Sequence, residues 1–112
     1  MGIQNWSDDI VLVSLVKEPN ISNELQAVTG MVTSKGGFDI VIDFADVEII
    51  TSSSISKFLS LREHLITAGH HLVFSSVSPR LKKIFIVTGL DNIFNFVDDK
   101  FVALAGLQLA EC

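Results

Sequence analysis

Four consecutive hydroxyl side chains are the residues whose type and spacing best suit chemistry in this chain: Thr51, Ser52, Ser53 and Ser54. They precede an amphipathic segment that is predicted to be a helix, so they would lie at its N-terminus. One hydroxyl is enough to cap a helix. A phosphate is also electrostatically favoured there, because unpaired amides and the helix dipole face it. The residues alone support a helix cap and a phosphorylation site about equally.

Other catalytic, nucleotide-binding and metal-binding motifs are missing from the sequence. It has no glycine-rich phosphate loop, no dinucleotide-binding glycine pattern and no Gly-x-Ser-x-Gly elbow around a serine nucleophile. The histidines, His64, His70 and His71, and the single cysteine, Cys112, lack the spacing of zinc ligands. We interpret His70 and His71 as solvated residues of a turn. The sequence therefore predicts no enzyme, no metal site and no cofactor.

Composition and charge limit the class of protein. A chain of 112 residues with 48% hydrophobic residues is expected to form one domain over residues 1–112. Its net charge of −5 argues against nucleic-acid partners and against an anionic membrane surface. The start lacks the pattern of a signal peptide, and no apolar run is long enough to cross a bilayer. We expect a cytoplasmic protein.

Strand and helix patterns alternate on both sides of the hydroxyl cluster. Strands are expected near Trp6 and over residues 10–16, 38–44, 72–77 and 93–97. Helices are expected over residues 22–33, from the cluster to about Ala68, from Ser78 to Gly89, and after Asp99. This order predicts an α/β fold, with a mixed four- to five-stranded sheet and about four helices packed mainly on one side.

The central strand, residues 38–44, alternates strictly between two faces. Ile40 and Ile42 would point toward the helices, whereas Asp39 and Asp43 would point to the other face. We expect this strand to be half-buried, with the two aspartates on a solvated face.

Three segments, in order, resemble the STAS domains of anti-sigma factor antagonists, and the similarity covers residues 10 to 99. The first is the strand IVIDF (residues 40–44) followed by the hydroxyl cluster, where the family typically shows an apolar residue and then Asp-Ser-Ser-Gly. The second is the turn at Ala68 and Gly69 before the strand at 72–77. The third comprises VSPRL (77–81) and TGLDNIF (88–94).

The resemblance implies regulation by partner switching. In such systems the unmodified antagonist binds a serine kinase that is also an anti-sigma factor, and the sigma factor is released. The kinase uses ATP to phosphorylate a serine at the start of the second helix, which corresponds to Ser53 here, and a phosphatase reverses the step. The docking surface would include Ser52 and the neighbouring Ser56 and Lys57. Homodimer formation remains open.

The chain departs from the family pattern at three positions. Thr51 and Ser54 stand where Asp and Gly are usual, and Asn20 stands where another Asp is common. These changes are expected to leave no carboxylate beside the acceptor serine. They also keep an alternative open, in which the protein is a non-phosphorylated adaptor or scaffold subunit of a stress-signalling or lipid-transport ATPase complex. For small-ligand binding the sequence shows no pocket pattern, and the basic residues Arg80, Lys82 and Lys83 are interpreted as a solvated helix face.

Overall fold

The computed structural model describes residues 2–15, 18, 20–35 and 38–111. The strands are β1 (Gly2–Ser7), β2 (Ile10–Ser14), β3 (Asp39–Asp43), β4 (Leu72–Ser75) and β5 (Asn95–Val97). The helices are α1 (Ile21–Lys35), α2 (Ser52–Thr67), α3 (Pro79–Val87) and α4 (Lys100–Glu111), together with the short 3-10 helix η1 (Leu90–Asn92). Each element predicted from the sequence is present, and the α/β class is confirmed.

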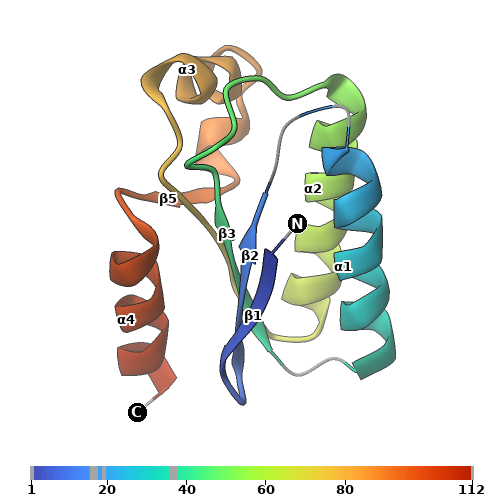
Figure 1. The fold of residues 1–112 in the computed structure, drawn as a ribbon, viewed down its shortest axis with the longest axis vertical. Coiled ribbons are helices and arrows are strands. Elements are labelled where there is room, and N and C mark those ends of the chain that lie inside the picture. Colours follow the sequence, from blue (N-terminus) through green and yellow to red (C-terminus); the bar gives the residue numbers. More distant parts are fainter. Residues whose placement is uncertain (1, 16–17, 19, 36–37, 112) are drawn as a thin grey trace.

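The five strands form one sheet in the order β1-β2-β3-β4-β5. β1 pairs antiparallel with β2, whereas β2, β3, β4 and β5 run parallel to one another. The helices α1 and α2 are therefore crossover connections, and they lie side by side on one face of the sheet (Figure 1). Both helices consequently begin at the edge where the parallel strands end, which is where binding sites of such sheets usually lie.

Phe74 of β4 is the centre of the larger hydrophobic core. Its ring centroid lies 4.6 to 5.9 Å from those of five other phenylalanines, Phe44, Phe58, Phe85, Phe94 and Phe96. Phe58 belongs to α2 and Phe85 to α3, so this aromatic cluster fixes both helices against the sheet.

The last helix, α4, covers the opposite face of the sheet (Figure 1). Ala103, Leu104 and Leu107 of α4 pack against apolar side chains of the three central strands: Ile10, Leu12, Val41 and Val73. As a result every residue of β3 is buried, including Asp39 (3% exposed) and Asp43 (8% exposed). The expectation of a half-buried strand with solvated aspartates is wrong, because α4 returns to that face.

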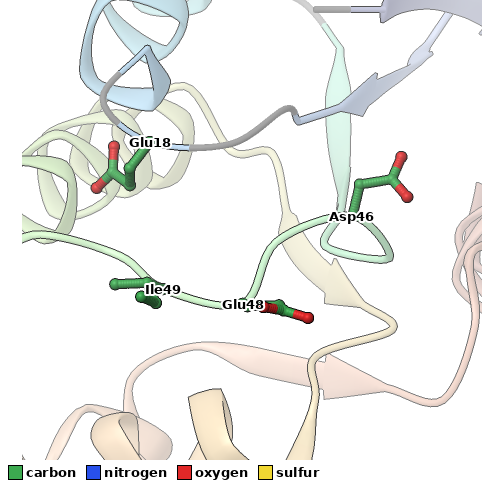
Figure 2. Close-up of a pocket in the computed structure, with 4 residues that line it drawn as sticks. All are labelled: Glu18, Asp46, Glu48 and Ile49. Atoms are coloured by element: carbon green, nitrogen blue, oxygen red, sulfur yellow. The ribbon is translucent and has the colours of Figure 1, made fainter.

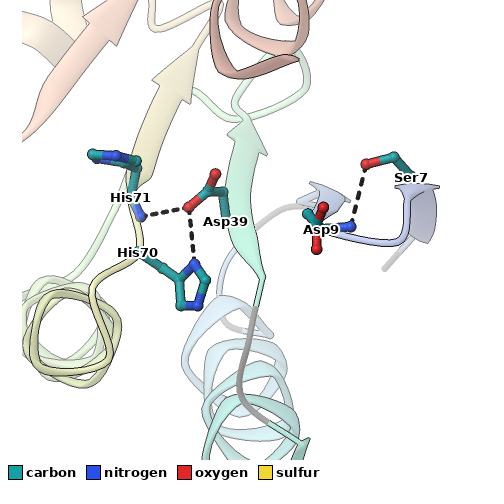
Figure 3. A network of polar contacts seen from close by, with 5 residues as sticks. All are labelled: Ser7, Asp9, Asp39, His70 and His71. Carbon is teal, nitrogen blue, oxygen red and sulfur yellow. Dashed lines mark hydrogen bonds and ion pairs between the residues drawn. The ribbon is translucent and has the colours of Figure 1, made fainter. Parts of the chain in front are cut away.

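The Asp39 carboxylate is satisfied by the turn that follows α2 (Figure 3). It accepts a hydrogen bond of 2.8 Å from the backbone N–H of His71, and His70 Nδ1 lies 3.3 Å away. The Asp39 N–H donates to the carbonyl of Asp9 at 2.7 Å. The ring of His71 is exposed as expected, whereas His70 is partly buried against this pair. These bonds compensate the burial of a charged group at the edge of the sheet where β3 begins.

Replacement of Phe74 by alanine is expected to lower the free energy of unfolding by about 3–5 kcal/mol, because it empties the centre of the aromatic cluster. Urea denaturation measures this change. The matched control is Val87→Ala, at a position that is 77% exposed, which should change stability by less than about 0.5 kcal/mol. Equal effects of the two substitutions would show that the aromatic cluster does not hold the fold together.

Candidate functional site

Thr51 is the N-cap of α2. Its backbone is extended (φ −94°, ψ 163°), and its side-chain oxygen accepts a hydrogen bond of 3.2 Å from the N–H of Ser54. Its carbonyl accepts the N–H of Ile55 at 3.0 Å, which is the first bond of the helix. The capping interpretation of the hydroxyl cluster therefore holds for one residue of the four, as the physics of helix ends requires.

The three serines that follow have different environments. Ser54 is completely buried, whereas Ser52 and Ser53 are exposed in the first turn of α2. The Oγ atom of Ser53 lies 3.3 Å from that of Ser22, at the start of α1, and either hydroxyl can donate the hydrogen bond. Thr51 is exposed too, but its side chain is bonded to Ser54 as the helix cap, so Ser52 and Ser53 are the exposed serines of the cluster.

The carboxylate of Glu18, which precedes α1, lies against the N-terminus of α2. It accepts a hydrogen bond of 2.6 Å from the N–H of Thr51, and it accepts the hydroxyl of Ser54 at 2.9 and 3.1 Å. Negative charge is favourable at this end of a helix, and hydrogen bonds to a carboxylate are stronger than those between neutral groups. A carboxylate therefore lies at the start of α2, where the loss of the family's Asp residues was expected to leave none.

The contact between Glu18 and Ser54 also explains why a side chain is accommodated where the family usually has glycine. The Ser54 side chain is directed inward and its hydroxyl donates to the carboxylate. Sequence reasoning missed Glu18 because it is separated from Ser54 by 36 positions. The feature of the sequence that could have identified Glu18 is its place shortly after a parallel strand, at the edge of the sheet where the next helix begins.

The remaining predicted site residues lie at the starts of the same two helices. Asn20 is exposed, and its carbonyl accepts the N–H of Glu24 at 3.1 Å in the first turn of α1. Ser56 is exposed and Lys57 is partly exposed. Because residues three and four positions apart are neighbours on a helix surface, these two side chains extend the surface around Ser53.

A pocket of about 240 Å³ lies beside this helix start, and Figure 2 shows the residues that line it. Glu18 comes from the segment before α1, whereas Asp46, Glu48 and Ile49 come from the connection between β3 and α2. Ile49 is 62% exposed. The pocket is acidic, yet in the described part of the chain no three His, Cys, Asp or Glu side chains are grouped in a way that would hold a metal ion.

None of the helices within the described ranges has the length and apolar character needed to span a membrane.

Comparison with known proteins identifies what the chain resembles. The family model for the STAS domain matches residues 11–101. Among solved structures, a serine-to-glutamate variant of RsbS from Moorella thermoacetica has a TM-score of 0.83 at 17% identity, over 99% of this chain and 97% of that one. A STAS domain protein described as an anti-sigma-factor antagonist, from Planctomyces limnophilus, has a TM-score of 0.82 at 17% identity, over 96% and 97%.

A third similar structure is that of the anti-sigma factor antagonist SpoIIAA in its unphosphorylated form. It has a TM-score of 0.81 at 14% identity, over 96% of this chain and 95% of that one. No curated protein matches the chain. At these identities the structural likeness shows a common fold.

Replacement of Ser54 by alanine is expected to lower the free energy of unfolding by about 1 kcal/mol, because Glu18 loses a hydrogen-bond donor. The matched control is Ser53→Ala, which removes an exposed hydroxyl from the same turn and should cost less than about 0.5 kcal/mol. Both substitutions have a similar effect on helix propensity, so chemical denaturation of the two variants compares the hydroxyl contacts directly. A Ser54→Ala variant as stable as Ser53→Ala would contradict the role of the Glu18 contact.

Proposed function

The chain belongs to the STAS domain family, and from this we propose that it is an anti-sigma factor antagonist controlled by phosphorylation of Ser53. It acts by binding a protein partner in the cytoplasm, and it carries out no catalysis of its own. The observation that supports this most strongly is that the residues of the hydroxyl cluster have different environments. Thr51 caps α2 and Ser54 is buried against Glu18, while the Ser53 hydroxyl is exposed.

In the proposed reaction Ser53 is the substrate of a partner kinase that binds ATP. A bond forms between the Ser53 Oγ atom and the γ-phosphorus of ATP, the bond from that phosphorus to ADP breaks, and the hydroxyl proton passes to a base of the kinase. A phosphatase reverses the modification with water as the nucleophile. The chain contributes an accessible hydroxyl on a fixed helix start, and the kinase contributes the catalytic groups.

Electrostatics explain how the phosphate would alter binding. A phosphoserine carries a charge of about −1.5 to −2 at neutral pH. It would lie close to Glu18, and the acidic pocket that Glu18 forms with Asp46 and Glu48 is beside the same helix start. A partner that docks here would have to desolvate the phosphate next to these carboxylates. A penalty of about 3 kcal/mol would weaken binding on the order of a hundredfold.

The docking surface that we propose comprises the exposed start of α2 and its neighbours: Asn20, Thr51, Ser52, Ser53, Ser56 and Lys57. Ile49, whose side chain is largely exposed at the edge of the acidic pocket, offers an apolar contact beside these polar groups. This combination suits a protein interface, in which apolar contacts are surrounded by polar ones.

Structures similar to this chain include SpoIIAA in both its unphosphorylated and its phosphorylated form, with TM-scores of 0.81 and 0.73. These two structures support the proposal by analogy of fold. The alternative function, a non-phosphorylated adaptor, is favoured by one observation: Glu18 already places a carboxylate at the N-terminus of α2. A stressosome structure with a TM-score of 0.77 is among the similar folds.

Incubation with ATP and the serine kinase encoded nearest to this gene is expected to add one phosphate, which tryptic mass spectrometry should locate at Ser53. The Ser53→Ala variant should remain unmodified. The control is Ser60→Ala, which removes another exposed serine of α2 and should be phosphorylated at the rate of the wild type. A wild-type chain of unaltered mass, in a stable complex that ATP does not dissociate, would instead establish the adaptor function.

A further inference from the structure

Ser22 and Ser53 occupy equivalent positions in two neighbouring helices. Each is the second residue of its helix, α1 or α2, and their Oγ atoms lie 3.3 Å apart although 31 positions separate them in the sequence. In the unmodified protein this is an exposed contact between neutral hydroxyls, which contributes little to stability. Its importance depends on what is attached to Ser53.

We propose that Ser22 is a positioning residue for phosphorylated Ser53, an inference that rests on Ser53 being the phosphoacceptor. The Ser22 hydroxyl donates a hydrogen bond to the phosphate and thereby links the start of α1 to the start of α2. The phosphate is bonded to an atom that already lies 3.3 Å from Ser22 Oγ. Rotation of the two side chains is therefore enough to bring a phosphate oxygen within hydrogen-bond distance.

The hydrogen-bond donors around the site favour this direction for the phosphate, although the first turn of α1 also carries an acidic residue, Glu24. Glu18 presents only acceptor oxygens, and these are already bonded to Thr51 and Ser54. Ser22 presents a donor, and the first amides of α1 have no acceptor within their own helix. The positive ends of two helix dipoles thus lie near the phosphate, and a hydrogen bond to a charged oxygen is about twice as strong as one between neutral groups.

One consequence is that the start of α1 becomes part of the surface that changes on phosphorylation. The two helices already pack against each other along the sheet (Figure 1). A phosphate held by Ser22 adds a charged hydrogen bond at the end where the proposed docking surface lies. A partner would therefore meet a fixed phosphate between two helix starts, instead of a mobile one on α2 alone.

The test uses the full chain with phosphoserine encoded at position 53 during translation, so that it does not depend on any kinase. Phosphorus NMR follows the last ionisation of the phosphate as pH is raised. Because a donor stabilises the dianion, the Ser22→Ala variant should bind the last proton about threefold more tightly than the wild type, and its titration should move to higher pH. Ser22→Thr, which keeps a hydroxyl, should restore the titration of the wild type.

The control variant is Ser60→Ala, which lies two turns further along α2 and should titrate as the wild type does. Circular dichroism before the titration checks that each variant is folded. Identical titrations of wild type and Ser22→Ala overturn the inference, and so does a shift that Ser22→Thr fails to reverse. A kinase that leaves Ser53 unmodified contradicts the proposed function, and this titration gives its result independently of that outcome.

Discussion

The carboxylate of Glu18 constrains the start of α2, and the properties of the candidate site depend on that constraint. It accepts the backbone N–H of Thr51 and the buried hydroxyl of Ser54, so it orders the residues on both sides of Ser53. The Thr51 side chain accepts the N–H of Ser54, and the Ser54 hydroxyl donates to Glu18, so both side chains are occupied in internal bonds. Ser53, between them, keeps its hydroxyl at the surface, within reach of Ser22. Glu18 thus keeps the Ser54 hydroxyl in the interior and Thr51 caps the helix, which leaves Ser52 and Ser53 as the exposed serines of the cluster.

The topology of the sheet makes this arrangement possible. Parallel pairing of β2, β3 and β4 requires crossover helices, and α1 and α2 therefore begin at the same edge. With α1, α2 and α3 on one face and α4 on the other, the sheet itself has no free face over its central strands. Binding is left to the loops and helix starts at the edges. A protein of this architecture can change its surface charge at one edge while the core, centred on Phe74, stays as it is.

Much of the architecture was predictable because it is encoded in local patterns. The third helix begins with Ser78, whose side chain caps the N–H of Leu81 at 3.2 Å, and Pro79 follows at the first helical position. The hydroxyl cluster likewise predicted both the start of α2 and the candidate site. What periodicity could not reveal was which elements meet in space. The burial of Asp43 depends on α4 returning to the second face of the sheet, and the Glu18–Ser54 bond joins segments 36 positions apart.

The central claim is that a phosphate at Ser53 controls binding through surface charge. Calorimetric titration tests it most directly: the partner kinase, without ATP, is titrated with the unmodified chain and with the chain that carries encoded phosphoserine at position 53. The account predicts that the phosphorylated chain binds on the order of a hundredfold more weakly. Equal affinities of the two forms for the kinase would contradict it.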